Sequence, residues 1–181
     1  RLLANLNKTV SARWTVDHIH HCIDVLAGNG AIESFSSLPR LLRDSLVCEN
    51  WEGTHNTLYM QIARDIEKYQ IDEIFTQHLA SLIIESCEHK DVTVQLNTLE
   101  KLQLEIAAFK ADNSASQTLR LPSLIESMMI AYASFSLFHE AMHENETSES
   151  KTKYYQWQYF NELHKQKTSA SLNTDLLSIL S

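Results

Sequence analysis

Glycine and proline are nearly absent from this sequence. Only three glycines and two prolines occur among 181 residues, so few positions interrupt a helix or form a glycine-dependent turn. The rest is rich in Leu, Ala, Glu, Gln and Ile, a composition typical of helical proteins, and no segment alternates like a strand. We therefore predict an all-α protein.

Cysteine and positive charge are also scarce. Three widely spaced cysteines without a CxxC motif argue against a disulfide framework and indicate a reducing compartment. The N-terminus lacks a signal-peptide pattern, and we expect a cytoplasmic protein. The net charge is −8, and residues 71–181 carry 15 Asp and Glu against 8 Lys and Arg. This acidity argues against binding nucleic acid or an anionic membrane, which both need clustered positive charge.

Apolar residues recur every three or four positions along most of the chain, as they do on one face of a helix. Asn50 is expected to cap the third of these helices, and Ser36 or Ser37 the second. The most apolar helix is predicted to be central in a bundle, because Glu126 would be costly inside a membrane. The predicted helices cover residues 2–26, a segment from about Pro39 through Leu46, 51–69, 71–89, 91–111, about 119–144 and 151–167, with a short one around 172–180.

All three glycines fall in two short motifs, Leu26–Gly30 and Trp51–Thr54. Glycine in a helical protein marks backbone that bends tightly or approaches another group closely. In the second motif Glu52 precedes Gly53, which allows two interpretations. Glu52 is either a first-turn carboxylate favoured by the helix dipole, or a base beside a space that Gly53 keeps open for a substrate.

Residues 13–68 resemble the C-terminal helical segment of the acyl-CoA dehydrogenase family. Order and spacing agree with the family pattern apart from about one extra residue before Pro39, although Ala27 and Ala31 replace a usual glycine and a usual aromatic. Trp51 and the long extension beyond are most similar to the branch that includes the bacterial alkylation-response flavoprotein. The resemblance is carried by Asp24-Val25-Leu26-Ala27-Gly28-Asn29-Gly30, Leu38-Pro39-Arg40-Leu41-Leu42-Arg43-Asp44 and Trp51-Glu52-Gly53-Thr54-His55-Asn56.

The resemblance implies an FAD-dependent oxidoreductase of fatty acid metabolism that introduces a double bond between the α- and β-carbons of an acyl-CoA thioester. Glu52 matches the base that removes the α-proton, and its backbone N–H matches a group that binds the thioester carbonyl. Gly53 matches a residue that lines the acyl pocket. Trp51 is expected either beside the flavin or acyl chain, or in the core.

Cofactor contacts and assembly are implied in the same way. Family positions that contact FAD match Thr54, His55 and Asn56. A stretch that touches the FAD of a neighbouring subunit matches Asp24, Val25, Leu26, Ala27 and Gly28. A homodimer or homotetramer is therefore expected. Because helical rhythm begins at once after Arg1, we also expect a longer parent chain that supplies a flavin-binding β-barrel, without which these residues are not expected to be active.

These expectations give a two-part organisation. Residues 1–70 would be the end of an acyl-CoA dehydrogenase-type helical bundle, and residues 71–181 an appended helical subdomain. One alternative is a catalytically inactive family member that acts through residues 71–181 as a binding or assembly module.

A remote alternative is a zinc hydrolase. The segment His139-Glu140-Ala141-Met142-His143 fits HExxH, in which both histidines share a helix face and the glutamate is a base. Glu162 follows where a third ligand could stand. HExxH arises often by chance, and we favour two solvated surface histidines and no bound metal.

Overall fold

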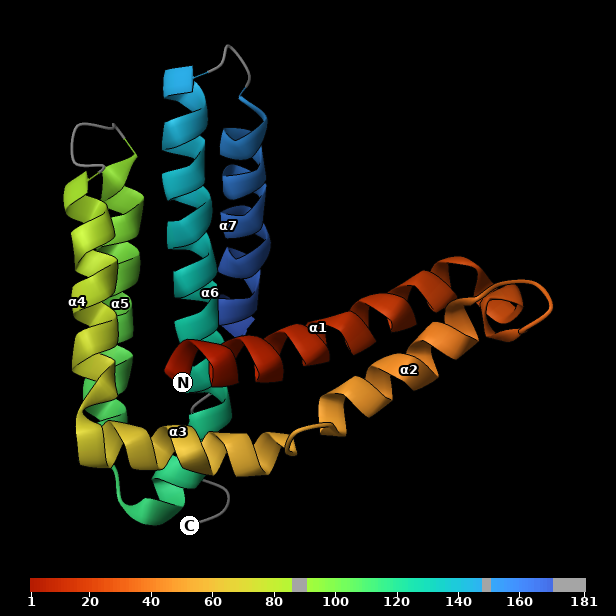
Figure 1. The fold of residues 1–181 in the computed structure, drawn as a ribbon, viewed down its shortest axis with the longest axis horizontal. Coiled ribbons are helices and arrows are strands. Elements are labelled where there is room, and N and C mark those ends of the chain that lie inside the picture. Colours follow the sequence, from red (N-terminus) through yellow and green to blue (C-terminus); the bar gives the residue numbers. More distant parts are fainter. Residues whose placement is uncertain (86–90, 148–150, 171–181) are drawn as a thin grey trace. The chain divides into compact units, whose positions relative to one another are not determined.

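The computed structural model describes residues 1–85, 91–147 and 151–170, and every regular element in these ranges is a helix (Figure 1). The all-α prediction is confirmed. The short helix predicted around 172–180 lies outside the described residues. The elements are α1 (Leu2–Val25), a 3-10 helix η1 (Ala27–Ala31), α2 (Leu38–Asn50), α3 (His55–Tyr69), α4 (Ile71–Glu85), α5 (Val92–Ala111), α6 (Ser114–Thr147) and α7 (Thr152–Ala170).

The chain forms two compact units, and each gathers segments that are distant in sequence. The first unit contains residues 1–75 and 103–129, and the second contains residues 76–102 and 130–181. Helices α4, α5 and α6 each contribute residues to both units. The two units are therefore groups of residues that pack together, and they are not two consecutive stretches of the sequence. The predicted division of the chain into residues 1–70 and 71–181 stays a prediction.

In the first unit, α1 and α3 share an apolar core. Leu6 on α1 and Ile62 on α3 are fully buried. Arg1 also pairs with the buried carboxylate of Asp65, with its Nε 2.8 Å from Oδ2. Burial along α1 stops at Ala12, however, and the second half of the helix has no buried side chain.

Beyond that point α1 runs beside α2, and η1 closes the pair into a hairpin (Figure 1). We call residues 13–47 the outer hairpin. Only Gly30 and Ser45 are buried within it, so none of its apolar side chains is in a core. The apolar periodicity of α1 predicts a buried face along the whole helix. In the structure that face is buried only in the first half of the helix.

The third helix begins at His55, and the predicted start at residue 51 is wrong. Asn50 was expected to cap this helix, but it is the last residue of α2, where its side-chain amide donates to the Leu46 carbonyl at 2.9 Å. Thr54 caps α3 instead, because its Oγ1 accepts from the Thr57 amide at 3.5 Å. Residues 51–53 are therefore a turn between two helices rather than the first turn of one.

The second unit encloses a buried polar network among apolar side chains. Ser134 on α6 is fully buried; its hydroxyl donates to Asn161 Oδ1 at 2.8 Å and accepts from Trp157 Nε1 at 3.3 Å. Gln95 on α5 donates to the Ser134 carbonyl at 3.2 Å. Asp91 directly precedes α5, and the hydroxyl of Tyr154 on α7 donates to one of its carboxylate oxygens at 2.5 Å. This hydrogen bond raises the pKa of Tyr154 to about 12.

Helix α6 is long and apolar enough over Ser114–Glu144 to cross a membrane, by length and composition alone. Ile125, Met128 and Phe135 on this helix are buried against other parts of the protein. Glu126 lies half-buried among them. Burial of this kind is typical of a core helix, which favours the predicted bundle over a membrane span.

Candidate functional site

The Trp51–Thr54 turn joins α2 to α3 with two consecutive residues in left-handed backbone. The φ angle is 62° at Glu52 and 127° at Gly53. A Cβ added to Gly53 would meet Leu58 at an ordinary 3.5 Å, so the backbone conformation, and not a lack of space, calls for glycine here. A left-handed glutamate is uncommon and persists only where its surroundings hold it.

The side chains of this turn face solvent in the described chain. Glu52 is exposed, and Trp51 is 67% exposed, so the core alternative for the tryptophan is wrong among these residues. Thr54 and Asn56 are also exposed. Because Thr54 is the N-cap, Glu52 lies before the helix and is not a first-turn carboxylate. The first-turn position that the first interpretation assumed for Glu52 is therefore wrong.

A charged cluster lies at the two ends of α2 and α3 that flank the turn. The Glu49 side chain is only 9% exposed, and Arg13 Nε lies 3.1 Å from its Oε1 as an ion pair. His55 Nε2 lies 3.9 Å from the same oxygen and donates to the Thr9 carbonyl at 3.1 Å. Lys8 Nζ donates to the Glu49 carbonyl at 3.0 Å and to the preceding carbonyl at 2.7 Å. Helices α1, α2 and α3 therefore meet in one polar cluster.

Lys8, Arg13 and Glu49 were not among the site residues predicted from the sequence. One signal was present, because an acidic residue in the last turn of a helix opposes the helix dipole and so calls for a local partner. That signal does not say which residue is the partner. The predicted FAD contact His55 is half-buried in this chain and directed towards α1.

The other glycine motif follows α1, where Gly28 and Gly30 were expected to mark a tight bend or a close approach. The left-handed residue of this bend is Ala27, with a φ of 50°. Gly30 is required for another reason: an added Cβ would lie 2.4 Å from the Ile23 carbonyl oxygen. Gly28 has open space around it.

The predicted contacts with a neighbouring flavin are all exposed, from Asp24 to Gly28. They lie at the opposite end of α2 from Glu52 (Figure 1). The 13 residues of α2 span about 20 Å at 1.5 Å per residue. One chain therefore does not bring the two motifs together.

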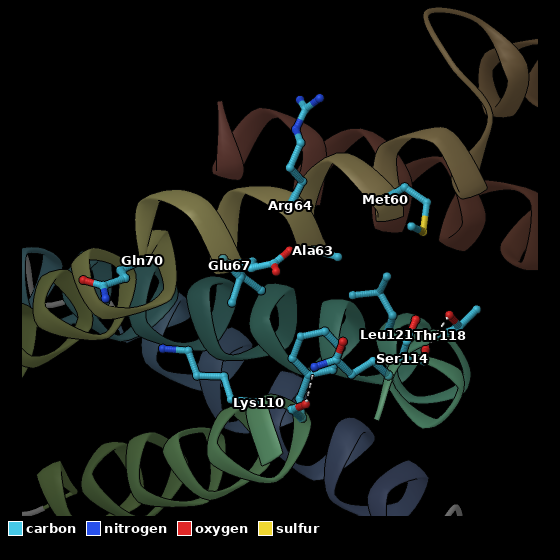
Figure 2. A pocket seen from close by; sticks show the side chains of 12 residues that line it. Met60, Ala63, Arg64, Glu67, Gln70, Lys110, Ser114, Thr118 and Leu121 are labelled. Carbon is cyan, nitrogen blue, oxygen red and sulfur yellow. Dashed lines mark hydrogen bonds between the residues drawn. The ribbon is translucent and has the colours of Figure 1, made fainter. Parts of the chain in front are cut away.

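A cavity of about 470 Å³ lies between α3, α5 and the start of α6 (Figure 2). Met60 and Glu67 line it from α3 and Gln70 from the C-cap of that helix, and Lys110 and Leu121 face them. A second cavity of about 350 Å³ lies at the start of α2. Glu52 lines neither of these two cavities.

The HExxH segment is engaged in other contacts. His139 Nε2 lies 3.1 Å from Glu85 Oε2, Glu140 pairs with Lys153 at 2.7 Å, and the proposed third ligand Glu162 pairs with a lysine. Within the described ranges, no group of three His, Cys, Asp or Glu side chains is placed to hold a metal. The zinc alternative therefore gains no support from this part of the chain.

Residues 1–67 match the family model of the acyl-CoA dehydrogenase C-terminal domain. The match covers about a third of the chain and contains both glycine motifs and Glu52. No curated protein and no solved structure matches the chain. The comparison supports the resemblance to the family over these residues, whereas the alkylation-response branch stays a prediction.

Proposed function

We propose that this chain is the C-terminal part of an FAD-dependent acyl-CoA dehydrogenase-like oxidoreductase, with Glu52 as the base that removes the α-proton of an acyl-CoA thioester. The observation that carries the proposal is the turn within the matched region. It presents an exposed carboxylate on left-handed backbone, whereas the neighbouring Glu49 is buried and paired. An accessible carboxylate on strained backbone is typical of a functional group.

The proposal requires the rest of the protein to cover Glu52. A thioester α-proton is too weakly acidic for a carboxylate surrounded by water, and excluding water from the site makes the carboxylate a stronger base. The Glu52 backbone N–H would bind the thioester carbonyl and so stabilise charge on its oxygen as the α-proton moves to the carboxylate. Bound FAD would supply the hydride acceptor for the β-hydrogen.

The residues present fit a flavin that other parts of the assembly help to hold. Thr54 and Asn56 are accessible beside Glu52, and they would contact the flavin of the same site. The exposed stretch Asp24–Gly28, about 20 Å away along α2, would contact the flavin of a neighbouring subunit. His55 would reach a flavin only from its half-buried position next to α1.

The outer hairpin supports an assembled protein. Val25 is 84% exposed, and Phe35 and Val47 are each 59% exposed. Apolar surface gathered on one segment marks a region that contacts another protein surface. We propose that the remainder of a longer parent chain and further subunits of a homodimer or homotetramer cover this hairpin.

The test uses the full-length protein that contains this chain, purified with its flavin. Anaerobic acyl-CoA thioesters of several chain lengths should bleach the visible flavin absorbance. Glu52→Gln should keep the flavin but slow bleaching by about 10²–10⁴-fold, the range for losing a general base. Bleaching at the wild-type rate in Glu52→Gln would contradict the assignment of the base. Bound flavin that acyl-CoA does not bleach even in the wild type would favour the inactive binding or assembly module.

A further inference from the structure

We propose that Lys8, Arg13, Glu49 and His55 form a positioning cluster that fixes the Trp51–Thr54 turn and so determines where Glu52 stands. The consequence for catalysis rests on the proposed function. The restraint on the turn rests on the contacts alone.

The turn needs a restraint because its conformation is not one that the chain prefers. Glu52 has left-handed backbone, which is disfavoured for a residue with a Cβ. Its side chain is exposed, and packing around that side chain therefore does not hold the conformation. What holds the turn must act on the residues that flank it.

On the α2 side, the restraint comes from two cations of α1. The last carbonyls of a helix have no intrahelical partner, and Lys8 binds two of them, at 2.7 and 3.0 Å. Glu49 is buried, and a buried carboxylate is costly unless it is paired. Arg13 supplies the opposite charge, with its Nε 3.1 Å from Glu49 Oε1, as an ion pair in which this oxygen accepts no hydrogen bond. The end of α2 is therefore tied to α1 through both its backbone and a side chain.

On the α3 side, the restraint comes from the first residue of the helix. His55 Nε2 lies 3.1 Å from the Thr9 carbonyl oxygen, which can only accept, so this nitrogen carries the proton and donates. The same nitrogen lies 3.9 Å from Glu49 Oε1. Residues 8–13 of one regular helix thus hold both flanks of the turn, and the separation of those flanks is fixed by α1.

Two substitutions test the cluster with little change in shape. Glu49→Gln removes the buried charge, and Lys8→Met removes the ammonium group but keeps an apolar stem. Glu100→Gln, the same change at an exposed site on α5, is the matched control. In the flavin-loaded full-length protein, both test variants should lower the bleaching rate at saturating acyl-CoA by about 10–100-fold, as expected for a misplaced reacting group. The dissociation constant of the substrate should change by less than about threefold in the same variants.

The rate per bound flavin separates positioning from general stability. A merely structural role would reduce the yield or the flavin content but leave the rate of each loaded molecule unchanged, and that result would overturn the proposal. Lys8→Met keeps the test informative if burial makes Glu49→Gln fold poorly, because Lys8 is only half-buried.

A measurement that needs no activity separates this inference from the proposed function. Amide hydrogen exchange of the peptide spanning residues 50–54 should accelerate by about tenfold or more in both variants, because local opening becomes easier, and should be unchanged in Glu100→Gln. Acceleration in a protein whose flavin is never bleached would support the restraint while the proposed function fails. Unchanged exchange would overturn the restraint, whatever the bleaching assay shows.

Discussion

The outer hairpin and the second unit use the same helical periodicity but differ in what covers their apolar faces. Among residues 13–47 no apolar side chain is buried. In the second unit, Phe135, Phe138 and Trp157 are each at most 3% exposed, and Ser134 joins three helices through buried hydrogen bonds. The second unit therefore has a complete core within the described chain, and the outer hairpin does not.

The difference shows what an amphipathic pattern specifies. Periodicity predicts which face of a helix is apolar, but it does not say which segment or molecule covers that face. All three motifs that carry the family resemblance lie within the outer hairpin or just beyond its end. The proposed function accordingly puts its chemistry on surfaces that other parts of an assembly would complete.

The same substitution in the two regions should have very different effects. Phe135 is 2% exposed and Phe35 is 59% exposed. Phe135→Ala should lower the free energy of unfolding by about 3–5 kcal/mol, because it leaves a cavity in the core. Phe35→Ala should change it by less than about 0.5 kcal/mol. Denaturant unfolding of the 181-residue chain measures both, and similar losses would mean that the hairpin is covered after all.

Two glycines within the outer hairpin should also differ, by a smaller amount. A methyl group at Gly30 would lie 2.4 Å from a backbone oxygen of α1, whereas Gly28 has nothing within 4 Å. Gly30→Ala should therefore destabilise the protein by about 1–3 kcal/mol, as overpacking does. Gly28→Ala should stay within about 0.5 kcal/mol of the wild type. Thermal unfolding followed by circular dichroism compares them, and equal midpoints would contradict the close approach of η1 to α1.

Local signals in the sequence predicted most of the helices. The first helix was expected at residues 2–26 and is found at Leu2–Val25, and the second begins within one residue of Pro39. Spacing and helix caps act within a few residues, so a single sequence contains them. The start of α3 was missed because Asn50 and Thr54 are both good caps. In the structure Asn50 ends α2 and Thr54 caps α3. Lys8 of α1 binds two carbonyls at that end of α2, a contact that the local sequence does not indicate.

The candidate site could be predicted only in part, for the same reason. The scarcity of glycine pointed to both motifs, and the Glu52–Gly53 pair stood out within one of them. Lys8 and Glu49 gave no joint signal, since they are 41 residues apart and meet only when α1 packs beside α2. Tyr69 shows the same limit: it continues the apolar stripe of α3 but is 54% exposed.

The smallest expected effect concerns Ala27, where the family pattern has glycine. Ala27 is left-handed, with a φ of 50°, and glycine adopts this conformation without the clash of a Cβ. Ala27→Gly should therefore raise the free energy of unfolding by about 0.5–1 kcal/mol.

Ala31→Gly is the matched control at the other end of η1. Ala31 is not left-handed, so the added chain entropy should lower stability by about 0.5–1 kcal/mol. Effects of the same sign at both positions, measured by thermal unfolding, would mean that the backbone does not hold Ala27 left-handed. Left-handed backbone would then no longer explain why the family pattern has glycine where this chain has Ala27.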